Sequence, residues 1–183
     1  GHGTYHLQVN NARLNEDLAG IYISSAATSF NLFVNGEKIT SQGRVSGSEE
    51  TSIPRHQGSV AYFPAPGEDF EIIVQVANYS YPRGGLWLST YFGSASSINA
   101  FHSVLSHQQV FLFGALFMVT IFSLTIFLFL RRALASFYLA LTCISLIVLY
   151  DSLSQLMIYD IFPGITFDAV VRIWFLSTVW APF

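Results

Sequence analysis

The sequence predicts an all-β sandwich or jelly roll followed by an α-helical transmembrane bundle. Residues 110–130 form an apolar run of 21 residues without a charged side chain, and Arg131 and Arg132 follow directly. About 20 apolar residues, rising 1.5 Å each, cross the roughly 30 Å core of a bilayer. A basic pair after a span marks the cytoplasmic side, so the residues before it are expected to face outward. These residues contain short stretches of alternating apolar and polar side chains, which is typical of strands.

Seven segments carry the strand pattern, with turn residues between them: residues 5–9, 18–23, 30–34, 37–40, 59–63, 70–76 and 86–92. Asn35-Gly36 is the dipeptide best suited to a two-residue hairpin turn. Polar, Gly-rich and Ser-rich residues 42–57 predict a long exposed loop, and residues 78–85 predict a second one. Short strands without a helical stretch favour an antiparallel sandwich. Additional N-terminal strands are expected to complete it.

The helical part is expected to hold three spans, at residues 110–130, 135–158 and 168–183, the last one truncated. The sandwich is assigned to residues 1–95, and the polar residues 96–109 are interpreted as a linker, for whose later part we consider a short helix along the membrane interface. The turn at residues 160–164 contains no Lys or Arg, which agrees with an outer position.

Charge and residue types exclude several classes of function. The net charge of −3 arises before residue 98, from five basic and eight acidic side chains. No basic patch of the kind that binds nucleic acid is present. The five histidines lack metal-ligand spacing, so no metal or cofactor is expected, and Cys143 is interpreted as a packing residue. No nucleophile motif appears, and Glu68, Asp69 and Glu71 crowd one turn, so a glycosidase is disfavoured. No catalytic residue, and no enzyme activity in this stretch, is expected.

Two polar residues in the predicted spans need an explanation, because ionisable groups are costly there. Asp151 and Arg172 would reach the same depth from neighbouring spans, and we consider an intramembrane ion pair between them. The alternative is that each reaches the headgroup layer separately.

The loop at residues 78–87 concentrates aromatic rings, one guanidinium group and paired glycines. Aromatic faces stack on sugar rings, while Asn and Arg donate directed hydrogen bonds. The candidate ligand-binding residues are therefore Arg44, Asn78, Tyr79, Arg83 and Trp87. The alternative is structural: the glycines satisfy a tight turn, Trp87 caps the core and Arg83 binds loop carbonyls.

The order of these motifs resembles a known family, the bacterial seven-transmembrane receptors with diverse intracellular signalling modules, in their type-2 extracellular domain. The resemblance rests on Phe33-Val34-Asn35-Gly36-Glu37, Gly43-Arg44-Val45-Ser46, Pro54, residues 71–78 and Arg83-Gly84-Gly85-Leu86-Trp87, followed by the spans. It implies a galactose-binding-like jelly roll ahead of seven helices. It also implies a periplasmic sensor domain on a multi-pass protein of the bacterial inner membrane.

The same resemblance implies a signal-transduction receptor whose partners are the lipid bilayer, a carbohydrate-like or other small-molecule ligand and its own cytoplasmic output domain. That output domain would be a histidine kinase or diguanylate cyclase. The sequence leaves a homodimer open. The alternative function is a membrane transporter or an envelope-assembly component whose sandwich docks a partner protein. The lack of internal Pro or paired Gly in the spans before Pro182 disfavours transport.

Overall fold

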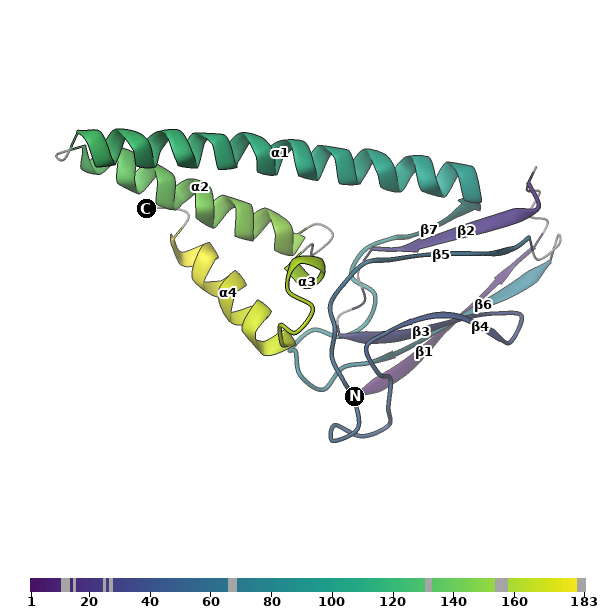
Figure 1. The fold of residues 1–183 in the computed structure, drawn as a ribbon. Helices are drawn as coiled ribbons and strands as arrows, with labels where there is room; N and C mark the ends of the chain where they lie inside the picture. Colours follow the sequence, from purple (N-terminus) through teal and green to yellow (C-terminus); the bar gives the residue numbers. More distant parts are fainter. Residues whose placement is uncertain are drawn as a thin grey trace. The chain divides into compact units, whose positions relative to one another are not determined.

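The computed structural model describes residues 1–10, 14, 16–24, 26, 28–65, 69–130, 133–153 and 158–180. The chain divides into two compact units, Gly1–Ser103 and Val104–Phe183. The first unit contains all seven strands of the described residues, and the second is helical (Figure 1). The chain passes from one unit to the other within helix α1.

The first unit consists of two antiparallel sheets. One has the strand order β1-β6-β3-β4 and the other β5-β2-β7, and Figure 1 shows them as two layers. The strands are β1 (His2–Val9), β2 (Leu18–Ile23), β3 (Ser29–Val34), β4 (Glu37–Gln42), β5 (Ser59–Pro64), β6 (Phe70–Ala77) and β7 (Thr90–Ser94). The prediction of an antiparallel all-β region is confirmed.

The hairpin between β3 and β4 forms as the Asn35-Gly36 dipeptide predicts. Both residues have positive φ, 48° and 80°, as a two-residue turn of the primed type requires. The Asn35 side chain also binds the neighbouring strand, because its Oδ1 accepts a hydrogen bond from Glu71 N at 3.0 Å. The turn is thereby fixed against β6.

The core lies between the two sheets and is built from the inward side chains of both. Ile21, Phe30 and Leu32 are fully buried there. Phe92 of β7 crosses the interior, with its ring 5.1 Å from that of Phe70 and 6.4 Å from that of Phe63. The alternating pattern of β3 and β6 therefore has its origin in one buried face per strand.

Strand β1 forms an edge of its sheet, and its core-side residues are only partly covered. Tyr5 and Leu7 pair with Val74 and Ile72 of β6. These two β6 residues are buried, whereas Tyr5 is 47% and Leu7 58% exposed. The three-stranded sheet therefore covers β6 but leaves the inner face of β1 open.

The last predicted strand differs from the structure. Residues 86–89 precede β7, which begins only at Thr90. Leu86 makes an isolated bridge with Ala26 and packs against the core. The Leu86 side chain packs against the core at the point where the chain crosses from one sheet to the other. The apolar residues that predicted a strand here therefore belong to a connection between the sheets.

The segment expected to be a linker is helical. Helix α1 (Ala95–Phe129) begins directly after β7 and includes residues 96–109. It is followed by α2 (Leu134–Leu153), the short α3 (Ile158–Ile161) and α4 (Phe167–Trp180). Arg131 and Arg132, and parts of the second and third expected spans, lie outside the described residues.

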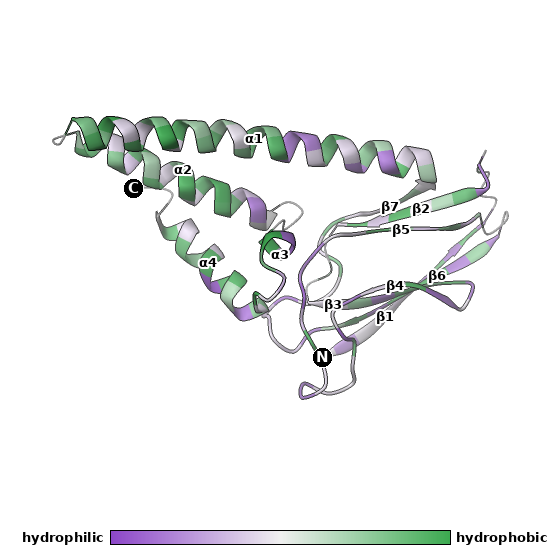
Figure 2. Ribbon diagram, in the orientation of Figure 1, coloured by the Kyte–Doolittle hydropathy of each residue, from purple (hydrophilic) through white to green (hydrophobic). Residues whose placement is uncertain are grey.

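In the helical unit, α1 and α2 pack antiparallel. The rings of Phe127 and Phe137 are 5.1 Å apart near the joint between the two helices, and those of Phe113 and Tyr150 are 6.2 Å apart farther along. Figure 2 shows apolar residues dominating α2 and the later part of α1. Both helices are long and apolar enough to cross a membrane.

Much of this apolar surface is left uncovered by the residues that the structure describes. Only 11% of the most apolar stretch of α1 is buried, and 22% of that of α2. Phe111 and Phe129, for example, are 79% and 84% exposed. A core helix of a soluble protein would bury such side chains, so the exposure is compatible with a lipid environment.

Candidate functional site

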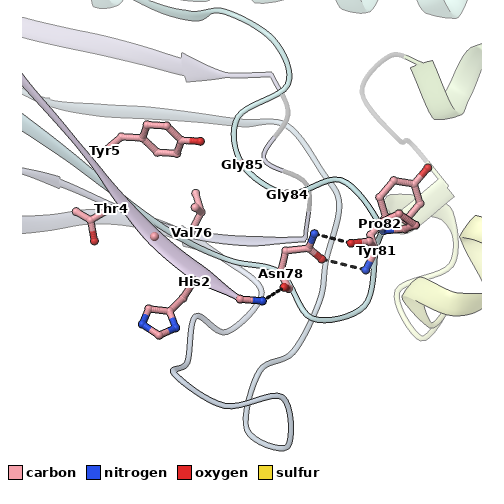
Figure 3. A pocket seen from close by; sticks show the side chains of 11 residues that line it. His2, Thr4, Tyr5, Val76, Asn78, Tyr81, Pro82, Gly84 and Gly85 are labelled. Carbon is pink, nitrogen blue, oxygen red and sulfur yellow. Dashed lines mark hydrogen bonds between the residues drawn. The ribbon is translucent and has the colours of Figure 1, made fainter.

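An open hollow of about 610 Å³ lies at one end of β1, beside the loop that follows β6. Its wall is made by the first five residues of the chain and Val76, and by Asn78, Tyr81, Pro82, Gly84 and Gly85 of the loop (Figure 3). Among these lining residues there is no carboxylate and no guanidinium group. The hollow therefore offers hydroxyl, amide and imidazole groups together with aromatic rings.

Asn78 holds the loop that lines the hollow. Its Nδ2 donates a hydrogen bond to Tyr81 O at 2.7 Å, and its Oδ1 accepts one from Tyr81 N at 3.0 Å, as Figure 3 shows. Asn side chains form such turns with their own backbone readily. Of the five candidate ligand-binding residues, Asn78 is the one that lines the hollow, and its amide is already engaged in shaping it.

Tyr79 connects the two long loops of the sandwich. Its hydroxyl donates a hydrogen bond to Ser46 O at 3.4 Å and lies 3.2 Å from His2 Nδ1. Arg44 stands in the same long loop as Ser46, where its backbone pairs with that of Ile53 at 2.8 and 3.1 Å. The structure thus brings Tyr79 and the Arg44 loop together, with the Arg44 side chain exposed.

Trp87 is half-buried between two rings. The rings of His56 and Tyr81 both lie 5.3 Å from it. Its Nε1 is a buried donor that has no acceptor among the described residues. Arg83 is exposed in the same loop. Trp87 therefore joins the residue 42–57 loop to the loop beside the hollow through His56 and Tyr81.

Tyr5 and Gly85 both line the hollow; Gly85 is one of the paired glycines of the predicted loop, whereas no sequence pattern connects Tyr5 with that loop. Gly85 has a φ of +88°, and a side chain there would meet the Tyr5 hydroxyl at 2.4 Å. Figure 3 shows the Tyr5 ring directed toward this turn. Tyr5 belongs to the alternating pattern of β1, and only the pairing of β1 with β6 places it beside a loop 80 residues later.

The outer face of the β5-β2-β7 sheet holds the start of α1. Gly20 of β2 pairs with Gly93 of β7, and a side chain at Gly20 would meet Ile98 Cβ at 2.9 Å. Ile98 is 4% exposed. The two glycines therefore make a flat place, here called the glycine shelf (Gly20 and Gly93), on which the first turn of α1 lies.

Aromatic side chains surround the glycine shelf. Tyr22 points away from the core yet is only 4% exposed, because Phe101 and His102 of α1 cover it with rings 6.1 and 5.5 Å away. Tyr91 of β7 lies 4.7 Å from Phe101. Burial, and secondarily Tyr91, raises the pKa of the Tyr22 phenol. The first two turns of α1 are thus part of the sandwich.

Glu16 caps the same end of α1. Its carboxylate accepts hydrogen bonds from the Ser96 hydroxyl and, at 3.1 Å, from Ser96 N, while Ser94 Oγ accepts one from Ser97 N at 3.3 Å. Acceptors at a helix N-terminus satisfy amides that have no partner within the helix. These bonds lower the pKa of Glu16 from its ordinary value of 4.5, with the Ser96 side-chain bond the largest cause.

The cap should weaken in acid. The pKa of Glu16 is lower in the folded state than in the unfolded state. The ionised carboxylate therefore stabilises the fold fully above pH 4.5, and this stabilisation is lost as the pH falls through the folded-state pKa. The melting temperature of Glu16→Gln should therefore lie below that of the wild type at pH 7, and the two should converge on acidification. Glu49→Gln, in an exposed turn, serves as the control. A difference that persists unchanged at pH 3 would contradict the cap.

The structure pairs the two intramembrane candidates differently from the expected ion pair. Asp151 is 7% exposed and Gln109 is fully buried. Asp151 Oδ1 accepts a hydrogen bond from Gln109 Nε2 at 3.2 Å, and Oδ2 accepts one from Ile158 N at 3.3 Å. Asp151 therefore connects α1, α2 and the start of α3.

Arg172 instead pairs within its own helix. Its guanidinium lies 2.8 Å from the Asp168 carboxylate one turn earlier in α4, and both side chains are exposed. Side chains four residues apart on a helix are neighbours, so Arg172 pairs with Asp168 and not with Asp151 as considered above. Gln109 was overlooked because a neutral residue in a polar stretch gives no sign of a partner 42 residues away.

Comparison with known proteins adds no relative. No protein-family model matches the chain, and no curated protein matches it.

Proposed function

We propose that the chain is the sensory part of a multi-pass receptor in the bacterial inner membrane, of the family that its sequence resembles. In this proposal the jelly-roll sandwich lies on the periplasmic side and binds a small neutral ligand such as a carbohydrate. Through the helices, ligand binding to the sandwich then changes the activity of a cytoplasmic output domain, so that the two sites are coupled.

One observation supports this proposal most directly. Strand β7 ends at Ser94, and a helix of 35 residues begins at Ala95. A domain with an open hollow is therefore joined, without a linker, to a helix long and apolar enough to cross a membrane. Such a junction transmits a displacement, whereas a flexible linker would lose it.

The lining of the hollow supports this ligand class. Its lining has the Tyr5 and Tyr81 rings, the His2 and Thr4 side chains and no carboxylate or guanidinium among the described lining residues. Aromatic rings bury the faces of sugar rings, and hydroxyl groups exchange hydrogen bonds with neutral polar side chains. A neutral polyhydroxylated ligand fits this chemistry.

Ligand binding is tested with the full receptor in lipid nanodiscs. A panel of neutral mono- and oligosaccharides is screened by the melting temperature of the sandwich, and at least one should raise it with increasing concentration. Tyr81→Ala should weaken that binding by about tenfold, the value of one aromatic contact of 1.4 kcal/mol. Lys38→Ala, on the distant β3–β4 hairpin, should leave it unchanged. Failure of the whole panel at millimolar concentration would contradict the ligand class.

The rim residues predicted from the sequence are tested in the same assay. Arg83→Ala and Trp87→Ala should weaken binding if the ligand extends from the hollow onto the loop. Trp87→Ala should also lower the melting temperature, because it removes a ring held by His56 and Tyr81. Unchanged affinity and stability in both variants would remove the rim from the site.

Orientation is tested separately. Ser48→Cys lies in an exposed turn of the sandwich and is introduced with Cys143→Ser, which removes the native thiol. A membrane-impermeant maleimide should label position 48 in intact spheroplasts. Labelling only after lysis would place the sandwich in the cytoplasm and refute the proposed orientation.

A further inference from the structure

The loop that lines the hollow leads directly into the strand that holds α1. Residues 78–89, here called the crossing segment, run from the end of β6 to the start of β7. The crossing segment is attached at defined points: Trp87 lies between two rings, Leu86 bridges Ala26, and Ser89 O accepts a hydrogen bond from Ser24 Oγ at 3.3 Å. A shift of the segment is therefore passed along the chain to Thr90.

Strand β7 is suited to respond to such a shift. It is an edge strand, and β2 is its single hydrogen-bonded neighbour in the sheet that the described residues form. An edge strand can slide or tilt against one neighbour, whereas a central strand must disturb two. Its outward residues Tyr91 and Gly93 face the beginning of α1, and Tyr91 contacts Phe101.

The contact with α1 is unusually close for the outer face of a sheet. Gly20 leaves no room for even a methyl group beneath Ile98, and Tyr62 of β5 donates a hydrogen bond to Asn99 Oδ1 at 3.4 Å. All three strands of the sheet therefore contact the first two turns of α1. Movement of β7 against β2 changes this surface directly.

We propose that the crossing segment, β7 and the first two turns of α1 form one transmission path, in which Gly20 and Tyr22 are the positioning residues that seat α1 on the sheet. The proposal rests on the proposed receptor function and assigns its output route to specific contacts. Gly20 sets the distance between α1 and the sheet. Tyr22 sets where α1 lies on the sheet, because its ring contacts Phe101 and His102 of the helix.

The path is tested without a ligand, by amide hydrogen exchange on the full chain in nanodiscs. Trp87→Phe loosens the crossing segment while retaining an aromatic side chain, and Trp87→Leu is a second variant should the first change too little. Exchange of the α1 amides at residues 98–103 should rise about fivefold or more, the lower range of ordinary coupling between sites. Amides of β4, on the other sheet, should not change.

Coupling must also be reciprocal, because it is a free energy shared by two places. Gly20→Ala, which lifts α1 at the glycine shelf, should raise exchange in residues 85–89 by a similar factor. A merely structural role of Gly20 would loosen α1 and leave the crossing segment as it was. The matched control is Ile39→Ala, which disturbs the core from β4 and should alter neither region selectively.

Two results would overturn the proposal. One is faster exchange of the crossing segment in Trp87→Phe and Trp87→Leu with unchanged exchange at residues 98–103. The other is a response to Gly20→Ala that stays within α1. A failed saccharide screen would refute the ligand class and leave these exchange results standing, so the two failures are distinguishable.

Discussion

Replacing Asp151 by leucine is expected to lower the free energy of unfolding of the helical unit by about 2–5 kcal/mol, since a buried donor left without a partner costs about 1–3 kcal/mol. Two donors lose their acceptor at once, Gln109 Nε2 and Ile158 N. Gln109 is fully buried and cannot turn to water. The loss is measured by titrating the purified full chain from detergent into dodecyl sulfate and following the helical circular dichroism.

Two further variants identify the cause. Asp151→Asn keeps one oxygen acceptor and should cost less than Asp151→Leu. The double variant Gln109→Leu/Asp151→Leu removes both partners of the hydrogen bond. It should recover part of the lost free energy of unfolding, because an apolar pair leaves no buried polar side chain of the two without a partner. A double variant as unstable as the sum of the single ones would show that the two residues do not interact.

Replacing Phe30 by alanine is expected to destabilise the sandwich by about 3–5 kcal/mol, the usual cost of removing a buried aromatic ring. Phe30 is fully buried and lies on β3, the strand between β4 and β6. Its removal leaves a cavity that both sheets line and that neither can fill without moving. Melting of the full chain, followed by tyrosine and tryptophan fluorescence, measures the effect.

The neighbouring Phe33 supplies the control for Phe30. It lies on the same strand but is half-buried, so Phe33→Ala removes the same atoms with less loss of packing. We expect it to cost less than half as much as Phe30→Ala. Equal losses would mean that the core does not lie between the two sheets as described.

The strands could be predicted because their signal is local. In β3 and β6 buried side chains alternate with more exposed ones, and the sequence records this alternation residue by residue. The Asn35-Gly36 turn is equally local, since the backbone angles that it needs are those that these two residues tolerate.

Contacts between distant residues could not be predicted in the same way. Residues 86–88 are apolar and resemble a strand, but Leu86 packs against the core where the chain changes sheets. The polar residues 96–109 resembled a linker because the glycine shelf exists only once β2 and β7 are paired. The sequence singles out Asp151 because it is ionisable, but its partner Gln109 lies in that same polar stretch and carries no charge.

The packing of α1 on the sheet also determines where this domain can be cut and joined to another protein. A soluble fragment ending at Ser94 would expose Tyr22, Tyr91 and the glycine shelf to water, and would lose Ser96, to which Glu16 is hydrogen-bonded. A fragment ending at Ser103 retains these contacts and stops before the apolar span. A chimaera that joins this domain to another protein should therefore be spliced after Ser103, nine residues inside α1, and not at the end of the last strand.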